Sequence, residues 1–306
     1  MRCKNNMQNK RSLWWRIKVN RHKYVLIAPF MIFFTIFTVI PILAAVFLSL
    51  TDYNLVGAPD FIGLANYSRI FFNDEVFLTA LRNTLLLALV TGPLGYLLCW
   101  IVAWFINDFP KWLRTVLTFV FYVPSLVGNV YFIWTYIFSG DSYGLLNSFL
   151  LSIGAIPEAI QWLTDVQYNM IVVIVVQLWM SLGVSFLAFI AGFQSMDRSL
   201  FEAGAIDGVR NRWQELWYIT LPQMKPSLLF GAVMQISSAF SISAVPQMLT
   251  GFPSVNYSTH TLLLHITDFG TIRFEMGYAC ALATILFLLM FFVKFLVEKL
   301  ISMVGQ

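Results

Sequence analysis

Long uninterrupted apolar runs restrict the fold of this 306-residue chain more than any other feature. A helix needs about 20 residues to cross the roughly 30 Å hydrocarbon core of a bilayer, so apolar runs of 18 or more residues are read as membrane spans. The runs here are too long for the strands of a transmembrane barrel, and they lack its alternating pattern. We therefore predict an all-α integral membrane protein with six transmembrane helices, at about residues 25–50, 79–106, 115–138, 168–193, 228–250 and 276–303.

The distribution of Lys and Arg orients these spans. Sixteen of the 19 lie in the N-terminal tail, the loops after spans two and four, and the C-terminal end, whereas residues 139–167 contain none. Cytoplasmic segments of membrane proteins are enriched in Lys and Arg. Both termini and the loop after span four are therefore predicted to be cytoplasmic. The same rule accounts for the net charge of +4 without nucleic acid.

The predicted topology divides the chain into a basic cytoplasmic tail, 1–24, and a six-span membrane domain, 25–303. A cytoplasmic loop at 194–227 lies within that domain. The tail contains Trp14 and Trp15 among basic residues, so it can lie on the membrane surface as an amphipathic helix. A basic signal that only fixes the topology is the alternative role.

Motifs for catalysis and metal binding are missing from the sequence. No lysine follows a glycine, so there is no phosphate-binding loop, and we do not expect this chain to hydrolyse ATP. The three cysteines and three histidines form no ligand pattern, so we expect no metal and no cofactor in this chain. Ion-coupled carriers need ionisable residues inside their spans. The near absence of such residues here indicates that energy for any transport comes from outside the chain.

A short helix is predicted at 199–207, in the cytoplasmic loop. Either Asp197 or Ser199 can cap its N-terminus, and Glu202 follows Ser199 at the spacing of a capping box. Such a polar, acid-bearing helix in the loop of a membrane protein is a candidate docking surface for a soluble partner. An ordinary amphipathic connector between two spans is the alternative interpretation.

The residues that follow Glu202 define the rest of this loop. Residues 203–205 are all small, so a partner can approach closely, and Gly208 permits a chain reversal. Pro222 and Pro226 are expected to break the next segment before span five begins.

This loop resembles that of the permeases of binding-protein-dependent ABC importers. Their pattern is Glu-Ala-Ala, three residues, Gly, nine residues, Ile, one residue and Leu-Pro. The chain is similar at 202–204, at Gly208 and at 219–222, but Gly204 replaces the second Ala and ten residues separate Gly208 from Ile219. The resemblance implies that the loop docks on a separate ATPase. The residues that it assigns to this coupling are Glu202, Ala203, Gly204, Asp207 and Gly208.

Other segments resemble the carbohydrate branch of these permeases. They lie in the first external loop, at the entry of span two, after span three, at the exit of span four and in the last span. Their positions are 61–67, 83–84, 143–147, 189–195 and 277–283. The resemblance therefore implies a carbohydrate, meaning a sugar or an oligosaccharide, as the substrate.

The resemblance also implies a fold and a set of partners. The fold is that of a type I ABC importer permease in the bacterial cytoplasmic membrane, surrounded by lipid. The partners are a second homologous permease subunit, an ATPase dimer that binds ATP and Mg, and an extracytoplasmic solute-binding protein, which would contact segments 139–167 and 251–273. The residues alone leave two alternatives open, a membrane scaffold or sensor with a docking loop and a permease for another polar solute.

Neutral polar residues inside spans four and five are the candidates for contact with the substrate. Gln235, Ser238 and Ser241 recur at i, i+3 and i+6, and Gln177 and Ser181 at i and i+4, so each set lies near one helical face. Amide and hydroxyl groups suit a neutral polyhydroxylated ligand. Packing between helices is the alternative role of serines in spans.

A break in span three provides a further candidate. Residues 124–129 read Pro-Ser-Leu-Val-Gly-Asn, and a helix interrupted there can expose backbone groups, and the Asn129 amide, to a cavity. Trp179, Phe240 and Tyr131 are candidates for stacking against sugar rings.

Overall fold

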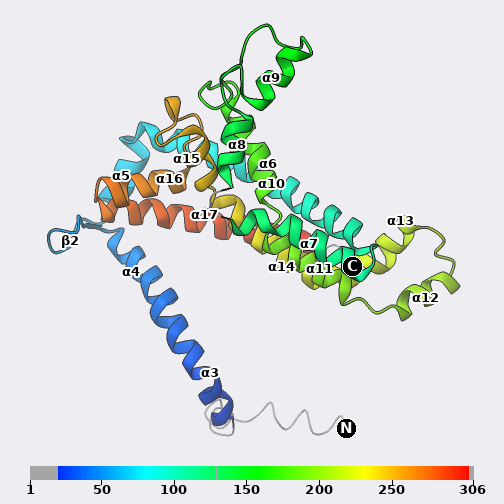
Figure 1. The fold of residues 1–306 in the computed structure, drawn as a ribbon. Helices are drawn as coiled ribbons and strands as arrows, with labels where there is room; N and C mark the ends of the chain where they lie inside the picture. Colours follow the sequence, from blue (N-terminus) through cyan, green and yellow to red (C-terminus); the bar gives the residue numbers. More distant parts are fainter. Residues whose placement is uncertain (1–19, 128–129, 303–306) are drawn as a thin grey trace.

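The computed structural model describes residues 20–127 and 130–302. The predicted basic tail lies outside the described residues for 1–19, and so does Asn129. The described chain is almost entirely helical, with one small two-stranded sheet (Figure 1). By length and composition it has five helices able to cross a membrane, or six when one bent pair is counted as a span.

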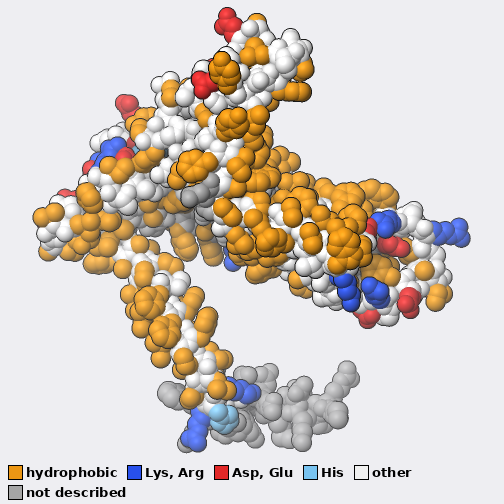
Figure 2. Space-filling model, in the orientation of Figure 1, with side chains coloured by type: hydrophobic (Ala, Val, Ile, Leu, Met, Phe, Trp, Pro, Cys, Tyr) orange, Lys and Arg blue, Asp and Glu red, His pale blue; other side chains and the backbone are white. Residues whose placement is uncertain are grey.

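The first helical run points away from the rest of the described chain at its N-terminal end and packs against α17 (Met276–Ser302) through α4 (Figure 1). It comprises α3 (Arg21–Phe34), a π-helical turn (Thr35–Val39) and α4 (Ile40–Leu48), and none of its most apolar window is buried. Pro41 lies in the first turn of α4 and has no N–H to donate, which explains the π-helical turn before it. Figure 2 shows apolar side chains covering this run on the visible face.

A short clasp follows this run. β1 (Thr51–Asp52) pairs antiparallel with β2 (Asp60–Phe61), and α5 (Ala65–Phe72) comes next. The buried amide of Asn66 donates hydrogen bonds to the carbonyls of Ser49 and Thr51, each at 2.9 Å. The segment 61–67 therefore ties the clasp to the end of the first run.

Four helices form the body. They are α6 (Glu75–Asn107), α11 (Val184–Gln194), α14 (Leu221–Phe240) and α17 (Met276–Ser302). Phe189 is fully buried in the core, and α14 meets it with Gly231, where an added Cβ would lie 2.6 Å from the ring. Small residues at such contacts let membrane helices approach closely.

Three of the predicted spans are interrupted. α7 (Lys111–Leu126) is followed by α8 (Tyr131–Ile137), so the predicted break in span three is present. α10 (Asn169–Met180) ends before α11 begins, and α14 ends before α15 (Ala244–Thr250) begins. The spans predicted at 168–193 and 228–250 lie within the apolar helical stretches Asn169–Gln194 and Arg212–Thr250, each of which contains a short break that the sequence analysis did not predict. Gly183 and the serines of 241–243 lie at these breaks, where the backbone leaves helical geometry.

The two prolines before span five do not break it. α12 (Ser199–Ile206) is followed by α13 (Arg212–Glu215), a π-helical turn (Leu216–Thr220) and α14, and the last three are continuous. Pro222 lies in the first turn of α14, directly after the π-helical turn, and Pro226 lies inside α14. The π-helical turn absorbs the missing N–H of Pro222, so the expected break is wrong and the helix begins earlier than predicted.

The remaining elements lie at the end of the body opposite α12 (Figure 1). α9 (Leu145–Ser152) belongs to segment 139–167, and the fully buried Asn147 organises that segment through five side-chain hydrogen bonds, among them 2.8 Å to the indole of Trp162. A 3₁₀ turn (Val255–Tyr257), α16 (Leu262–Thr267) and a π-helical turn (Asp268–Ile272) connect α15 to α17. Figure 2 shows Lys and Arg gathered at the other end of the body.

Candidate functional site

The start of α12 is fixed by Asp197 rather than by a capping box. The Ser199 N–H donates to Asp197 Oδ1 at 2.9 Å, and this bond lowers the pKa of the exposed carboxyl. No side-chain cap from Ser199 is present among the described residues, so the capping box with Glu202 is wrong and the Asp197 cap is the alternative that holds. Glu202 is left exposed on the first turn.

The end of α12 has the predicted chain reversal. Gly208 has φ +96°, a conformation that favours glycine. The Val209 N–H donates to the Gly204 carbonyl at 2.9 Å, which is the six-to-one bond of a Schellman motif. Asp207 closes the helix and is exposed.

Gly204 is small for a reason internal to the chain. An added Cβ would lie 2.6 Å from Cδ1 of Ile219, so α12 is packed there against the π-helical turn. Close approach of a partner is open at the exposed Ala203 instead. The side chain of Ile219 thus packs against the inner side of α12 at Gly204. The exposed side of the helix carries Glu202 and Asp207.

A second contact fixes the loop to the body. Nη1 of Arg212 lies 2.5 Å from Oδ2 of Asp108, at the end of α6. Asn211 caps α13, because its Oδ1 accepts the Gln214 N–H at 2.8 Å. The loop is therefore linked to α6 by this ion pair and is continuous with α14.

A polar cavity of about 630 Å³ lies where the three interrupted spans meet. Its wall contains the end of α7, the start of α8, and the breaks between α10 and α11 and between α14 and α15. Irregular backbone is tolerated at membrane depth only where protein buries it or where it lines a cavity. The helix breaks are therefore tolerated because their irregular backbone lines this cavity.

The cavity brings together every described residue predicted for the substrate path. They come from α10, from α14 and from the break after each helix, and they are Gln177, Ser181, Gln235, Ser238 and Ser241. Within the described part of the chain the hydroxyls of Ser238 and Ser241 have no hydrogen-bond partner, whereas Ser181 donates to the Leu178 carbonyl at 2.6 Å. Contact of these groups with a substrate stays a prediction.

Gln235 is held at the cavity wall by a close helix contact. Gly95 of α6 faces it, and an added Cβ there would lie 2.5 Å from its Nε2. The same Nε2 lies 3.5 Å from the Thr91 carbonyl, a long hydrogen bond. The amide therefore retains capacity for a stronger partner in the cavity.

Only one of the three predicted stacking residues lines the cavity. Tyr131 does so, but Trp179 packs edge-on against Trp134, with 5.2 Å between the ring centroids. Phe240 faces a separate apolar cavity between α6, α14 and α17. Residue pattern alone missed Tyr122, which lines the polar cavity from α7 and lies one turn before the predicted break.

A family model supplies the decisive comparison. Residues 95–303 match the binding-protein-dependent transport system inner membrane component. The chain belongs to this family. The resemblance inferred from the loop and the branch segments is thereby confirmed, and the chain is a multi-pass inner-membrane permease.

Two relatives extend the comparison over nearly the whole permease. The probable ABC transporter permease protein YesP of Bacillus subtilis is 33% identical over 92% of this chain and 91% of its own length. The arabinooligosaccharides transport system permease protein AraP of the same organism is 29% identical, over 90% of this chain and 87% of its own.

A solved structure shares the fold. It is the crystal structure of a bacterial alginate ABC transporter in complex with an alginate pentasaccharide-bound periplasmic protein. One chain of that complex superposes with a TM-score of 0.75 over 95% of this permease and 97% of its own length, at 22% identity. At that identity the likeness shows the fold alone.

A buried ionic cluster stabilises the end of the permease that lies opposite α12. Asp74 caps α6, because its Oδ1 accepts the N–H groups of Val76 and Phe77 at 3.0 Å. Its other oxygen lies 2.8 Å from Nε2 of His265 and accepts the Tyr278 hydroxyl at 2.6 Å. Burial alone would raise the pKa of Asp74, but the hydrogen bonds outweigh it and lower the pKa to about 2.

We expect Asp74→Asn to destabilise the permease by about 2 kcal/mol at neutral pH. A carboxyl whose pKa is depressed in the folded state stabilises it above the ordinary value of 3.8. That stabilisation is lost as the pH falls from about 4 to about 2. Thermal unfolding of the purified permease, followed across this range, should show an acid limb that Asp74→Asn flattens. Asp60→Asn, at an exposed carboxyl, is the matched control. If both variants flatten the acid limb equally, the acid dependence of stability does not come from Asp74.

Proposed function

We propose that this permease is one of two homologous subunits that form the translocation path of an ATP-driven importer of carbohydrate, a sugar or an oligosaccharide. The names of its relatives support the substrate class, because AraP belongs to an arabinooligosaccharides system. The solved neighbour carries alginate, an acidic polysaccharide.

The observation that carries the proposal is the chemistry of the polar cavity. Its described lining supplies amides, hydroxyls and two tyrosine rings among apolar side chains, and none of its residues is charged. A neutral polyhydroxylated ligand needs many hydrogen bonds and no charge partner. Interrupted helices that meet at a binding site are a recurrent arrangement in transporters.

The proposed topology has six spans with both termini in the cytoplasm. It counts α7 and α8 together as the third span. The distribution of Lys and Arg supports this orientation. α12 would then face the cytoplasm, while α9 and α16 would face outward from the other end of the body (Figure 1).

The proposed partners fit these two ends. An ATPase dimer would bind ATP and Mg and receive α12, so this chain needs no cofactor of its own. An extracytoplasmic solute-binding protein would dock on segments 139–167 and 251–273, where the Tyr143 side chain is 89% exposed. Among the described residues, α4 of the first helical run packs against α17, and the exposed side chains of α3 are left to lipid or to the second permease.

Gln235→Leu tests the path directly. We expect carbohydrate uptake to fall at least tenfold, since a hydroxyl of the sugar would lose its partner in a buried site, at a cost of about 1–3 kcal/mol. Uptake of labelled oligosaccharides by cells that express the whole transporter is the measurement. Gln247→Leu, on an exposed side of α15, is the matched control. Undiminished uptake with Gln235→Leu would contradict a role of Gln235 in substrate binding and would indicate that the binding groups lie on the other subunit.

Purification in mild detergent tests the proposed assembly. We expect mass spectrometry to identify a second permease and an ATPase with this chain. Recovery of the chain alone, or with an unrelated signalling protein, would contradict the importer assembly.

A further inference from the structure

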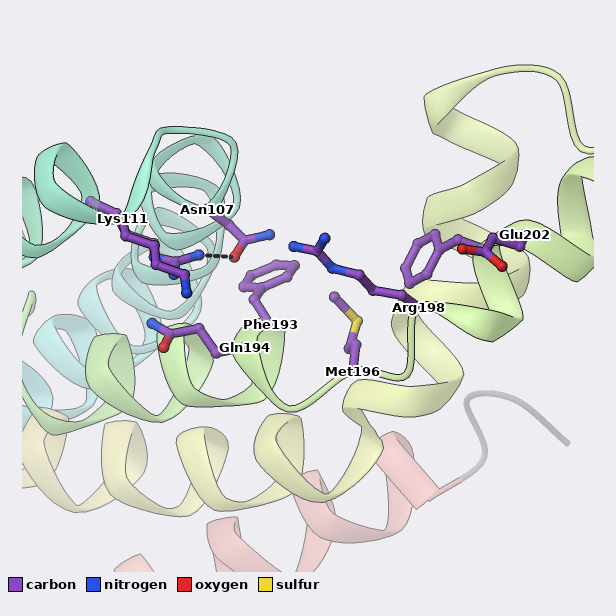
Figure 3. Close-up of a pocket in the computed structure, with 9 residues that line it drawn as sticks. Asn107, Lys111, Phe193, Gln194, Met196, Arg198 and Glu202 are labelled. Carbon is purple, nitrogen blue, oxygen red and sulfur yellow. Dashed lines mark hydrogen bonds between the residues drawn. The ribbon is translucent and has the colours of Figure 1, made fainter.

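Three cations surround a second pocket, at the end of the body that carries α12. This pocket, of about 630 Å³, has four charged lining residues: Lys111 and Arg114 from the first turn of α7, Arg198 at the start of α12, and the acid Glu202. Figure 3 shows Arg198 extending across the opening toward Asn107, while Glu202 lies on the far side. The pocket is distinct from the polar cavity of the substrate path.

The described residues offset only part of the positive charge in this pocket, because the Glu202 carboxylate also lines it but forms no ion pair with the three cations. Among the described residues, none of the three cations forms an ion pair. Arg114 donates only to the neutral Oδ1 of Asn107, at 3.4 Å, and the nearby carboxylate of Asp108 is bound by Arg212. The charge pattern therefore favours an anionic ligand.

An apolar groove continues from this pocket along α7. Lys111 and Arg114 line both, and the groove of about 450 Å³ runs on past Thr118, Phe119 and Ile190. Four residues of helix span about 6 Å, so Thr118 lies one turn deeper in the membrane than Arg114. Its hydroxyl is buried and has no partner among the described residues. That oxygen is not accessible from the groove, so the groove offers a basic mouth and apolar walls beyond it, which is the order of a charged headgroup and an acyl chain in a glycerolipid.

The basic end of the groove, at Lys111 and Arg114, is placed at the level of lipid headgroups by a neighbouring tryptophan. Trp112, in the same turn as Lys111, is 69% exposed, and tryptophan is enriched at the level of lipid headgroups. A docked ATPase would reach the mouth but not the groove, which lies along a membrane-spanning helix. The occupant that fits both parts is a lipid.

We propose that this pocket and groove bind one anionic phospholipid, with its phosphate against Lys111, Arg114 and Arg198 and an acyl chain along α7. Basic pockets between membrane helices are suited to such headgroups. A lipid bound there would lie beside α12 and brace the proposed coupling loop against the body. The inference is independent of which solute the permease carries.

The test is native mass spectrometry of the purified complex with phosphatidylglycerol, with phosphatidylcholine of the same chains, and with inorganic phosphate. We expect one tightly retained phosphatidylglycerol and no comparable retention of the other two probes. Each cation replaced by Gln should weaken retention roughly fivefold, and the triple variant about a hundredfold. Arg210→Gln, an exposed cation of the same loop outside the pocket, should leave retention unchanged.

Three outcomes would overturn the proposal. Equal retention by the triple variant would show lipid adhering without a site. Displacement of the lipid by inorganic phosphate would show a site for a free anion. Binding that appears only after the ATPase is stripped away would make the pocket part of the ATPase interface. If the triple variant fails to assemble, Thr118→Phe, which fills the groove and keeps all three charges, should lower lipid retention by itself.

Discussion

Glu202→Lys is expected to reduce carbohydrate uptake at least tenfold while leaving membrane insertion intact. Glu202 is exposed on α12, and the helix is packed against Ile219 and anchored through Arg212. The side chain therefore has no structural task that the substitution would disturb. A charge reversal within a docked surface costs several kcal/mol, because it leaves the partner's polar group opposite the wrong sign.

Two measurements separate coupling from assembly in this experiment. Uptake by cells reports transport, and ATP hydrolysis by the purified complex reports whether the ATPase still responds to the loaded binding protein. We expect the response to disappear with Glu202→Lys and to be weakened with Glu202→Gln. Glu298→Lys, an exposed acid near the end of α17, is the matched control. Normal uptake by Glu202→Lys would remove the docking role from α12.

Gly277→Ala is expected to destabilise the permease by about 3 kcal/mol and to reduce the yield of assembled complex. An added Cβ at Gly277 would lie 2.1 Å from the backbone carbonyl of Thr51. The Gly277 N–H also donates to the Tyr53 carbonyl at 2.9 Å. The added Cβ would also lie 3.0 Å from the backbone nitrogen of Tyr53. Because both obstacles are backbone atoms, no side-chain rotation relieves the clash, and α17 must separate from the clasp that follows the first helical run.

A second glycine provides the control for this prediction. Gly92 lies inside α6, and an added Cβ there would meet only the Cβ of Ala239, at 3.7 Å, which is an ordinary contact. We expect Gly92→Ala to leave the thermal unfolding temperature unchanged or slightly raised, since alanine favours the helix. Similar losses from Gly92→Ala and Gly277→Ala would show that the close contact with Thr51 is not the cause.

Several segments that resemble the carbohydrate branch prove to hold the fold together. Asn66 ties the clasp to the first run, and Asn147 organises the segment around α9. Asn83 donates to the carbonyls of Tyr257 and His260, at 2.9 and 3.0 Å. A buried amide has four bonding positions to satisfy, so each of these side chains fixes two or more segments. Their partners lie up to 177 residues away in sequence, which no local pattern reveals.

The sequence by itself determined the class of protein and the membership of its family. Apolar runs and the Lys and Arg distribution follow from the properties of the bilayer, and the family motif of the loop at 202–222 is local in sequence, so each can be recognised without a structure. It also selected five polar residues that line one cavity, because helical periodicity places them on common faces.

Only the tertiary structure decided where the helices break and why particular small residues are small. The interruptions after Met180 and Phe240 occur inside strongly apolar spans, and they are tolerated because several helices converge there and enclose the exposed backbone. Gly204 and Gly277 lie so close to Ile219 and Thr51, respectively, that an added Cβ would clash with them. The basic pocket likewise exists only because α7 and the start of α12 are brought together by packing. Such features depend on distances between segments remote in sequence, and periodicity carries no information about those distances.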